Sequence, residues 1–344
     1  MYKGTGISKD QLSDDGEPCI LYGELYTKYK SETIREVISK TNIDNTKLVR
    51  SKANDVIIPC SGETAEDIAT ARCVLNGNIL LGGDLNIIRL HGYDGAFMSY
   101  QLNGRRKYDI AKVAQGVSVV HLYGEHLKGV KTINPCLEEQ KKIAKLLSLL
   151  DERIVTQNKI IDKLQSLIKG IAQNIVRNNK PNVRLSECLE SKSSTLQESD
   201  VCEQGTYPVY GANGIVGYLD NYNTEGEAVY IIKDGSGVGT VSYVKGKCSA
   251  TGTLNTLQAK EGYSLQYLYY LLKVFNFEPY KTGMAIPHIY FKDYGKAKVF
   301  CPSYTEQLQY ARLLPAIDNK LSIEQNILTE LTLQKQCLLR QMFI

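Results

Sequence analysis

The stretch that decides the fold reads EEQKKIAKLLSLLDERI from Glu138 to Ile154. Near the end of the chain, Thr305 to Leu321 reads TEQLQYARLLPAIDNKL, which repeats the Glu-Gln pair, an alanine, two leucines and an aspartate at the same spacing. Acidic residues followed by leucines three and four apart are typical of an amphipathic helix. The chain therefore contains the same helical sequence motif twice, and we call each of these two stretches a helical phrase.

The match between the two phrases extends well beyond them without a gap, at a constant offset of 167 residues. Upstream the matching residues include Gly116, His121, Tyr123 and Lys131, which correspond to Gly283, His288, Tyr290 and Lys298. A period this long is not that of a solenoid repeat. Residues 116–177 and 283–344 are two copies of one unit, which indicates a duplicated domain followed by a connector.

The helical part of each copy has apolar residues that alternate in steps of three and four, which predicts a heptad seam and paired coiled-coil helices. Both copies place a polar residue, Gln157 or Glu324, in the same slot, and such a residue can fix the register of a coiled coil. Another slot holds Ile168 in the first copy and Lys335 in the second. The predicted seam residues are Leu147, Leu150, Ile154, Ile161, Leu164, Leu314, Ile317, Leu321, Leu328 and Leu331.

Prolines limit the predicted helices. Pro135 and Pro302 end whatever precedes each helical phrase, and Pro315 falls inside the second phrase, where a proline kinks a helix or begins a new one. We therefore expect a short helix in each copy, followed by a longer one that starts near Asp151 or Asp318.

The segments between the helices are expected to be strands. Residues 205–258 alternate in polarity and are punctuated by glycine and asparagine, whereas residues 16–102 carry a weaker form of the pattern. The predicted class is α+β, with two similar domains and two long helices in the order domain, helix, domain, helix. The expected boundaries are a first domain at 1–134, its helix at 135–180, a second domain at 181–301 and its helix at 302–344.

Composition excludes several classes of protein. An apolar content of 43% and a charged content of 23% over 344 residues are ordinary for a globular chain of two domains. No long apolar run or signal core is visible, so we expect a cytosolic protein without a membrane partner. The 9 scattered cysteines suit reduced thiols, and the absence of CxxC and HExxH argues against a metal site.

No catalytic motif stands out. The sequence DGSGVG at Asp234–Gly239 lacks the ending of a P-loop and the spacing of a dinucleotide site, so a tight turn is expected there. Asn134–Cys136 is not the methyltransferase motif that begins Asn-Pro-Pro. The repeated His121 and His288 are expected to be packed, hydrogen-bonded residues, with a phosphate or base contact as the alternative.

The net charge is only +4, so any nucleic-acid binding must come from local basic patches. Of the 23 tyrosines, several lie next to lysine, and such pairs can hydrogen-bond phosphates and base edges. The candidate DNA-binding residues are Tyr22, Tyr26, Lys28, Lys30, Arg105, Arg106, Lys107, Tyr210, Asn213, Lys233, Ser236, Lys245, Lys281 and His288.

The arrangement resembles the DNA-specificity subunit of type I restriction–modification systems. The residues that carry the resemblance are Pro135, Glu139, Gln140, Ile143, Ala144, Leu147 and Asp151, with their repeat at Pro302, Glu306, Gln307, Ala311, Leu314 and Asp318. The chain departs from a simple repeat at Pro315, and its start, MYKGTG, lacks a counterpart of VRLSECL at Val183–Leu189. Residue 1 is therefore expected to fall inside a domain, which leaves a shortened or rearranged form open.

The resemblance implies that each globular domain is a target-recognition domain that reads one half of a split double-stranded DNA site. It implies further that the two long helices pair as an antiparallel coiled coil, in a pseudo-two-fold repeat, and act as the spacer. It also implies methyltransferase and restriction partner subunits, which use S-adenosylmethionine, ATP and magnesium, and no catalysis or cofactor on this chain. Two alternatives remain, a coiled-coil adaptor without specific DNA binding and an enzyme that binds a nucleotide at Asp234–Gly239.

Overall fold

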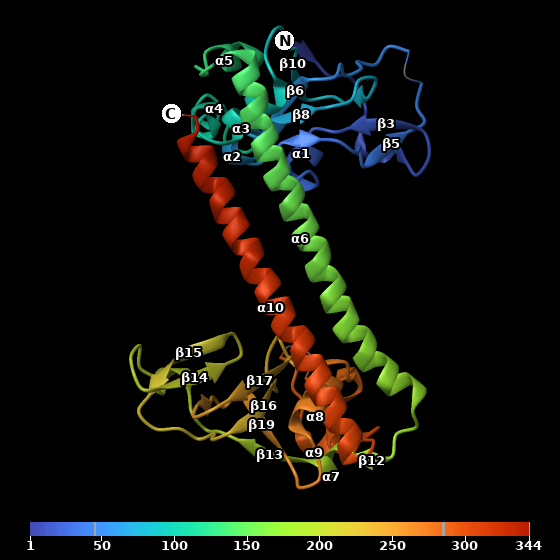
Figure 1. The fold of residues 1–344 in the computed structure, drawn as a ribbon, viewed down its shortest axis with the longest axis vertical. Coiled ribbons are helices and arrows are strands. Elements are labelled where there is room, and N and C mark those ends of the chain that lie inside the picture. Colours follow the sequence, from blue (N-terminus) through green and yellow to red (C-terminus); the bar gives the residue numbers. More distant parts are fainter. Residues whose placement is uncertain (45, 284–285, 344) are drawn as a thin grey trace. The chain divides into compact units, whose positions relative to one another are not determined.

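The structure is a computed structural model that describes residues 1–44, 46–283 and 286–343 (Figure 1). The chain divides into two compact units. Unit 1 comprises Met1–Asn158 and Asn326–Ile344, and unit 2 comprises Lys159–Gln325. Each unit contains sheets, short helices and parts of both long helices, so the predicted α+β class is confirmed.

Unit 1 is built on a five-stranded sheet in the order β1-β10-β6-β8-β4. A second sheet has the order β2-β5-β3-β9, and β7 pairs with β11. The strand bounds are β1 Tyr2–Lys3, β2 Leu12–Ser13, β3 Glu17–Ile20, β4 Thr33–Ile34, β5 Ser39–Thr41, β6 Asp55–Pro59, β7 Ser61–Gly62, β8 Arg72–Val74, β9 Leu80–Leu81, β10 Leu85–Ile88 and β11 Val120–His121.

The central strand β6 is buried on both faces of its sheet. Successive side chains of a strand point to opposite faces, so Val56 and Ile58 pack under α3 whereas Ile57 packs on the side of α1. The other short helices of unit 1 lie in the connections between strands, except α5, which lies between β11 and α6. The helical bounds are η1 Lys9–Gln11, α1 Glu24–Thr27, α2 Ala65–Ile68, α3 Gly95–Asn103, α4 Lys107–Lys112 and α5 Gly124–Lys128.

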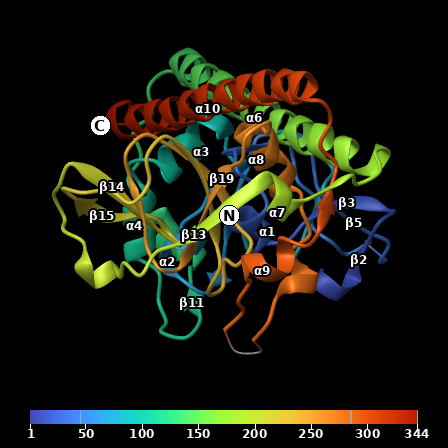
Figure 2. The same cartoon turned by 90° about the horizontal axis from the view of Figure 1, so that it is seen from below.

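Unit 2 has a four-stranded sheet in the order β13-β19-β16-β17, a three-stranded sheet β15-β14-β18 and the pair β12-β20. In Figure 2 the β14–β15 hairpin projects from the part that carries β13, β19 and α8. The strands predicted between residues 205 and 258 are confirmed. The bounds are β12 Val183–Arg184, α7 Leu185–Cys188, β13 Leu189–Ser193, η2 Glu198–Asp200, β14 Tyr207–Gly211, β15 Gly214–Leu219, β16 Glu227–Ile232, β17 Val241–Lys245, β18 Ser249–Ala250, β19 Leu254–Ala259, α8 Leu265–Lys273, η3 Glu278–Tyr280, α9 Phe291–Tyr294 and β20 Lys298–Val299.

Each helical phrase forms one continuous helix. Helix α6 runs over 42 residues, Leu137–Asn178, and α10 runs over 38 residues, Tyr304–Gln341. The expectation of a short helix followed by a longer one was wrong in both copies. Pro315 lies inside α10 without ending it. The neighbouring residues Leu314 and Ala311 are buried, and this packing helps to hold the turn that lacks one backbone hydrogen bond.

The predicted seam residues lie on the less exposed face of each long helix. Leu147, Ile161 and Leu314 are buried, and the other seam residues are less exposed than their neighbours on the outer helix faces. In unit 1 the first part of α6 packs with the last part of α10, through Leu147 and Leu339. In unit 2 the last part of α6 packs with the first part of α10. The two helices therefore run antiparallel.

The repeated Glu-Gln pair contains a buried glutamine that attaches each long helix to its own domain. In unit 1, the Gln140 side-chain oxygen accepts from the backbone N–H of Asp94 at 2.9 Å, and its amide nitrogen donates to the Pro135 carbonyl at 2.8 Å. Asp94 is the N-cap of α3. One side chain therefore links the start of α6 to the start of α3.

Unit 2 repeats this arrangement. Gln307 accepts from the backbone N–H of Ser264, the N-cap of α8, at 2.9 Å and donates to the Pro302 carbonyl at 2.9 Å. Gln140 and Gln307 are 1% and 2% exposed, so both amides are satisfied by protein groups away from water. This pair of contacts accounts for the glutamine of the repeated phrase.

The repeated aspartate has the same kind of role. The Tyr100 hydroxyl of α3 donates to Asp151 at 2.8 Å, and the Tyr270 hydroxyl of α8 donates to Asp318 at 2.5 Å. Burial and the neighbouring carboxylate raise the pKa of both phenols. Each tyrosine therefore stays protonated and acts as a donor.

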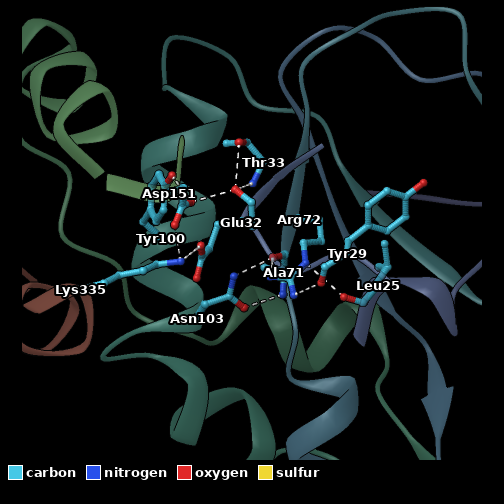
Figure 3. A network of polar contacts seen from close by, with 11 residues as sticks. Leu25, Tyr29, Glu32, Thr33, Ala71, Arg72, Tyr100, Asn103, Asp151 and Lys335 are labelled. Carbon is cyan, nitrogen blue, oxygen red and sulfur yellow. Dashed lines mark hydrogen bonds and ion pairs between the residues drawn. The ribbon is translucent and has the colours of Figure 1, made fainter. Parts of the chain in front are cut away.

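Unit 1 contains a buried ion cluster at its helix anchor (Figure 3). Lys335 of α10 lies 2.5 Å from Glu32 and 2.6 Å from Asp151, and Ser31 also donates to Asp151. Burial and the Asp151 charge raise the pKa of Glu32 even though Lys335 opposes the shift. The slot of Lys335 in unit 2 is Ile168, which packs in an apolar cluster with Tyr270 and Leu314. The two anchors therefore differ chemically.

Candidate nucleic-acid interface

The loops at one end of the central strands gather into a loop face in unit 1. We define it as residues 21–28, 60–64, 82–84 and 115–123. Three backbone hydrogen bonds tie these loops together: Gly82 N–H to Ile20 at 2.9 Å, Cys60 N–H to Asp84 at 2.7 Å, and Leu122 N–H to Cys60 at 2.7 Å.

The corresponding loop face of unit 2 is formed by residues 211–214, 233–240, 251–253, 282–283 and 286–290. Its loops are held by equivalent bonds: Thr251 N–H to Tyr210 at 2.9 Å, Lys233 N–H to Thr253 at 2.9 Å, and Ile289 N–H to Lys233 at 2.9 Å. Cys60 and Lys233 therefore occupy the same place on two like scaffolds. Ser61 and Asp234, which follow them, pair with His121 and His288.

In unit 1 the predicted residues Tyr22 and Lys28 line a cavity of about 630 Å³ on the loop face. Its other walls include apolar side chains and the polar residues Ser8, Lys9 and Asp84. The Lys28 ammonium lies 2.6 Å from the buried Glu24 carboxylate, which fixes its position at the rim. The cavity thus combines apolar walls with a few oriented polar groups, as ligand-binding concavities usually do.

Tyr26 lies next to this cavity, on the side of β7. A β-carbon placed on Gly62 would lie 3.6 Å from the Tyr26 hydroxyl oxygen. Burial, Tyr22 and Asp67 raise the pKa of Tyr26. The phenol is therefore a neutral donor at the edge of the loop face.

In unit 2 the predicted residues Tyr210, Asn213, Lys233, Ser236 and His288 come together. Asn213 is exposed in the β14–β15 turn, and Tyr210, which bonds to Thr251 through its backbone, half-buries its ring against Tyr230. Lys233 and Ser236 belong to the β16–β17 connection. His288 Nδ1 lies 2.6 Å from the Asp234 carboxylate.

The sequence Asp234–Gly239 forms the tight turn that we predicted. The N–H groups of Val238 and Thr240 bond to the carbonyls of Gly235 and Gly237, and Gly239 N–H bonds to Ile232. The expectation of a hydrogen-bonded histidine is confirmed for His288, which is part-buried. His121, by contrast, is exposed.

Other predicted residues lie away from the loop faces. Arg105 and Arg106 lie in the α3–α4 turn and Lys107 begins α4. In this turn a β-carbon on Gly104 would lie 2.7 Å from the Leu339 carbonyl of α10. Arg106 pairs with Asp109 at 3.5 Å. These three residues are therefore close to the helix anchor of unit 1.

Three further lysines are separated from one another. Lys245 pairs with Glu227 at 3.5 Å, at the opposite end of the β16–β17 pair from Lys233. Lys30 precedes Ser31, whose hydroxyl bonds to Asp151 of α6. Lys281 lies beside the unit 2 loop face and pairs with Glu278 at 2.6 Å.

Several loop-face residues were not predicted. Ser8, Lys9 and Asp84 line the unit 1 cavity, and Asp84 adopts a φ of 54°, in the left-handed region. The GGD sequence that ends in Asp84 is a turn signal and could have marked this position. In unit 2, Asp234 was assigned only to a turn, although its carboxylate orients His288.

The described residues contain no group of three histidine, cysteine or acidic side chains placed to hold a metal ion. Among the helices of residues 1–44, 46–283 and 286–343, none combines the length and the apolar character needed to cross a bilayer.

Comparison with known proteins identifies the unit 2 architecture. Residues 178–333 match the family described as the type I restriction modification DNA specificity domain. This part of the chain is similar to a type I DNA specificity domain. The resemblance to type I specificity subunits, expected from the repeated phrase, is thereby confirmed. The specificity domain begins at the end of α6 and includes β12 to β20 and most of α10.

Curated relatives carry the same description. The chain is 28% identical over 116 residues to the type I restriction enzyme EcoprrI specificity subunit of Escherichia coli, a match that covers 34% of this chain and 29% of that protein. A putative type I specificity subunit of Mycoplasma genitalium is 25% identical over 285 residues, covering 75% of this chain and 73% of that protein. The first match therefore spans less than a third of the E. coli relative's own length.

The fold as a whole also has a solved counterpart. The type I restriction-modification system S subunit from M. genitalium is similar over 100% of this chain and 93% of that chain, with a TM-score of 0.71 and 20% sequence identity. At this identity the likeness shows a shared fold. The shared fold therefore extends over the whole chain and not only over residues 178–333.

Proposed function

We propose that this chain is the DNA-specificity subunit of a type I restriction–modification complex and that each unit reads one half of an asymmetric, bipartite site. The observation that carries the proposal is the pair of loop faces. Equivalent backbone bonds hold both faces at the same end of like sheets, whereas their side chains differ, as at Cys60 and Lys233. A common scaffold with two different loop sets is suited to reading two different sequences.

The chemistry of the loop faces supports base readout more than binding by bulk charge. The net charge is only +4, so phosphate attraction alone gives little affinity. Tyrosine, asparagine and serine on the loops can hydrogen-bond base edges, and Lys28 and Lys233 can reach phosphates. Splitting the readout between two modules adds the discrimination of both half-sites.

The long helices would act as the spacer between the half-sites. Their buried seam and the repeated glutamine and aspartate anchors support this role, because they fix each domain to its own part of the helices. The resemblance further implies docking of modification and restriction subunits. Those partners would supply methyl transfer with S-adenosylmethionine, and translocation and cleavage with ATP and magnesium, so this chain needs no cofactor or catalytic residue.

A binding selection tests the proposal. The chain is assembled with its modification subunits and incubated with a random library of duplex DNA, and the bound fraction is sequenced. We expect enrichment of one asymmetric motif in two parts separated by a gap of fixed length. Assembly without enrichment of any motif would favour a coiled-coil adaptor without specific DNA binding.

A further inference from the structure

Both loop faces contain the same hairpin, although the rest of their side chains differ. In unit 1, Gln115 and His121 exchange two backbone hydrogen bonds at 2.9 and 2.7 Å across a turn that begins at Gly116. In unit 2, Thr282 and His288 do the same at 2.9 and 2.7 Å, and the turn begins at Gly283. We call these segments, residues 115–123 and 282–290, the His–Tyr hairpins; residues 284–285 lie outside the described part of the second.

The turn geometry explains why glycine recurs in the hairpins. Gly116 and Gly283 have φ angles of 124° and 87°, which disfavour any other residue. A β-carbon would also lie 2.1 Å from the Val119 carbonyl in the first turn and 2.3 Å from the Ile286 carbonyl in the second. Glycine is therefore favoured at this corresponding position in both units.

Each His–Tyr hairpin presents the same groups to solvent. Val119 and Ile286 occupy corresponding positions at the tips and are 52% and 59% exposed. His121 stacks on Tyr123 with ring centroids 6.2 Å apart, and His288 stacks on Tyr290 at 6.5 Å. The two tyrosines are 46% and 45% exposed. A core-packing role does not account for such exposure.

Each of these tyrosines also has a second basic neighbour. The His126 ring lies 5.6 Å from Tyr123, and the Lys292 ammonium lies 5.3 Å from the centre of Tyr290. The different residues use the same chemistry, a nitrogen donor next to the phenol. Each hairpin thus offers imidazole, hydroxyl and further basic donors around one ring, together with an apolar tip.

We infer that the two His–Tyr hairpins grip the sugar–phosphate backbone at each half-site without regard to sequence. This inference rests on the proposed function. A feature shared by both units is poorly suited to distinguish two different half-sites, whereas the duplex backbone meets both units in the same form. Phenol and imidazole donors suit phosphate oxygens, and an apolar tip suits the sugar edge. The hairpins belong to the same loop faces as the residues that differ between the units. Contacts to the DNA backbone and contacts to the bases would therefore be made by neighbouring loops.

The test uses the assembled methyltransferase complex, one cognate duplex taken from the selection and a scrambled duplex of the same length. Two double variants remove the donors, His121→Ala with His288→Ala and Tyr123→Phe with Tyr290→Phe. The second pair keeps the rings and tests the donors without emptying the stack. Losing a hydrogen bond to a charged group at each hairpin should weaken binding to both duplexes by at least about tenfold and leave their affinity ratio unchanged.

Three results separate the possibilities. Weaker binding of the cognate duplex alone would mean that the hairpins read bases, and unchanged DNA binding with loss of the modification subunits would mean that they dock protein. Either result overturns the inference and leaves the proposed function intact. A wild-type complex that binds both duplexes equally would instead contradict the proposed function.

Discussion

Lys335 lies 2.6 Å from Asp151, so the end of α10 is joined to the first half of α6 by an ion pair inside unit 1. The same ammonium lies 2.5 Å from Glu32 of the globular part. Because Ile168 fills the matching slot in unit 2, the ion pair gives one end of the helix pair a chemistry that the other end lacks. A buried polar group of this kind can specify one helix register over others.

Replacing Lys335 with methionine should destabilise unit 1 by about 3–5 kcal/mol, because two buried carboxylates lose their shared cation. The measurement is urea unfolding followed by hydrogen exchange of the last turns of α10. Lys128→Met removes an exposed lysine that pairs with Glu125 and should change stability by less than about 0.5 kcal/mol. Equal effects of the two substitutions would show that the cluster contributes nothing.

The loss caused by Lys335→Met should depend on pH in a definite direction. The pKa of Glu32 is raised above its ordinary value in the folded protein, mainly by burial and by Asp151. A carboxyl group whose pKa is higher in the folded protein contributes stability when the pH is below its pKa in the unfolded chain. This contribution is lost as the pH rises through its pKa in the folded protein. Without Lys335 the pKa of Glu32 should rise further, so the deficit of the variant should shrink as the pH falls from 7 towards 5. A deficit that grows on acidification would contradict this account.

Gln140→Ala and Gln307→Ala should each cost about 1–3 kcal/mol, since each leaves a buried backbone N–H and a carbonyl without their partner. The neighbouring exposed residue Glu139 provides the control, and Glu139→Ala should have an effect below about 0.5 kcal/mol. Chemical unfolding of the full chain measures all three. If the glutamine variants lose no more stability than the control, these hydrogen bonds do not hold the long helices to their domains.

Lys233→Ala should weaken binding to all duplexes and reduce the dependence of log affinity on log salt by about one, because Lys233 lies on the loop face of unit 2. Lys245→Ala is the matched control, since Lys245 lies at the other end of the same strand pair and faces Glu227. Salt titrations of the assembled complex distinguish them. An unchanged salt dependence for Lys233→Ala, or an equal loss of DNA affinity for Lys245→Ala, would contradict the placement of the DNA interface on the loop face.

How far the sequence could predict the fold is clearest at the tyrosine and aspartate anchors. Asp151 and Asp318 belong to the gapless repeat, so the sequence alone shows that they correspond. The sequence does not show their partners, because Tyr100 precedes its aspartate by 51 residues and Tyr270 precedes its aspartate by 48. The loops between the helices differ in length, so the tyrosines fall out of register even though their contacts are the same.

The candidate site was predictable where local chemistry decides it. Tyrosine next to lysine in the stretch Tyr22–Lys30 marked a loop-face segment, and Asn213 marked a turn. The cluster Arg105–Lys107 has the same local signal but lies beside Leu339, because tertiary packing of α10 determines what surrounds it. Likewise, the continuous α10 overrides the local effect of Pro315.

Seven residues inserted between Asn158 and Lys159, together with seven between Gln325 and Asn326, should change the accepted gap between the half-sites. The paired insertion keeps the heptad and adds about 10 Å to each helix, roughly three base pairs of rise, and three base pairs also rotate the duplex by about 100°. Both anchors remain in their own units. The altered complex should therefore bind the original site poorly and, if it binds, prefer a changed gap.

A series of duplexes with different gaps measures the effect of the paired insertion. An insertion in α6 alone is the control and should displace the seam and destabilise the chain. If the paired-insertion protein kept the original gap preference, the helices would not set the spacing.

The most direct test of the central claim is a map of methylated adenines in the host genome with and without this chain. The account predicts that removing the chain abolishes methylation at one asymmetric, two-part sequence with a fixed gap, and that Lys233→Ala weakens methylation of that sequence. An identical methylation map in the presence and absence of the chain, with the modification subunits expressed and active, would contradict it.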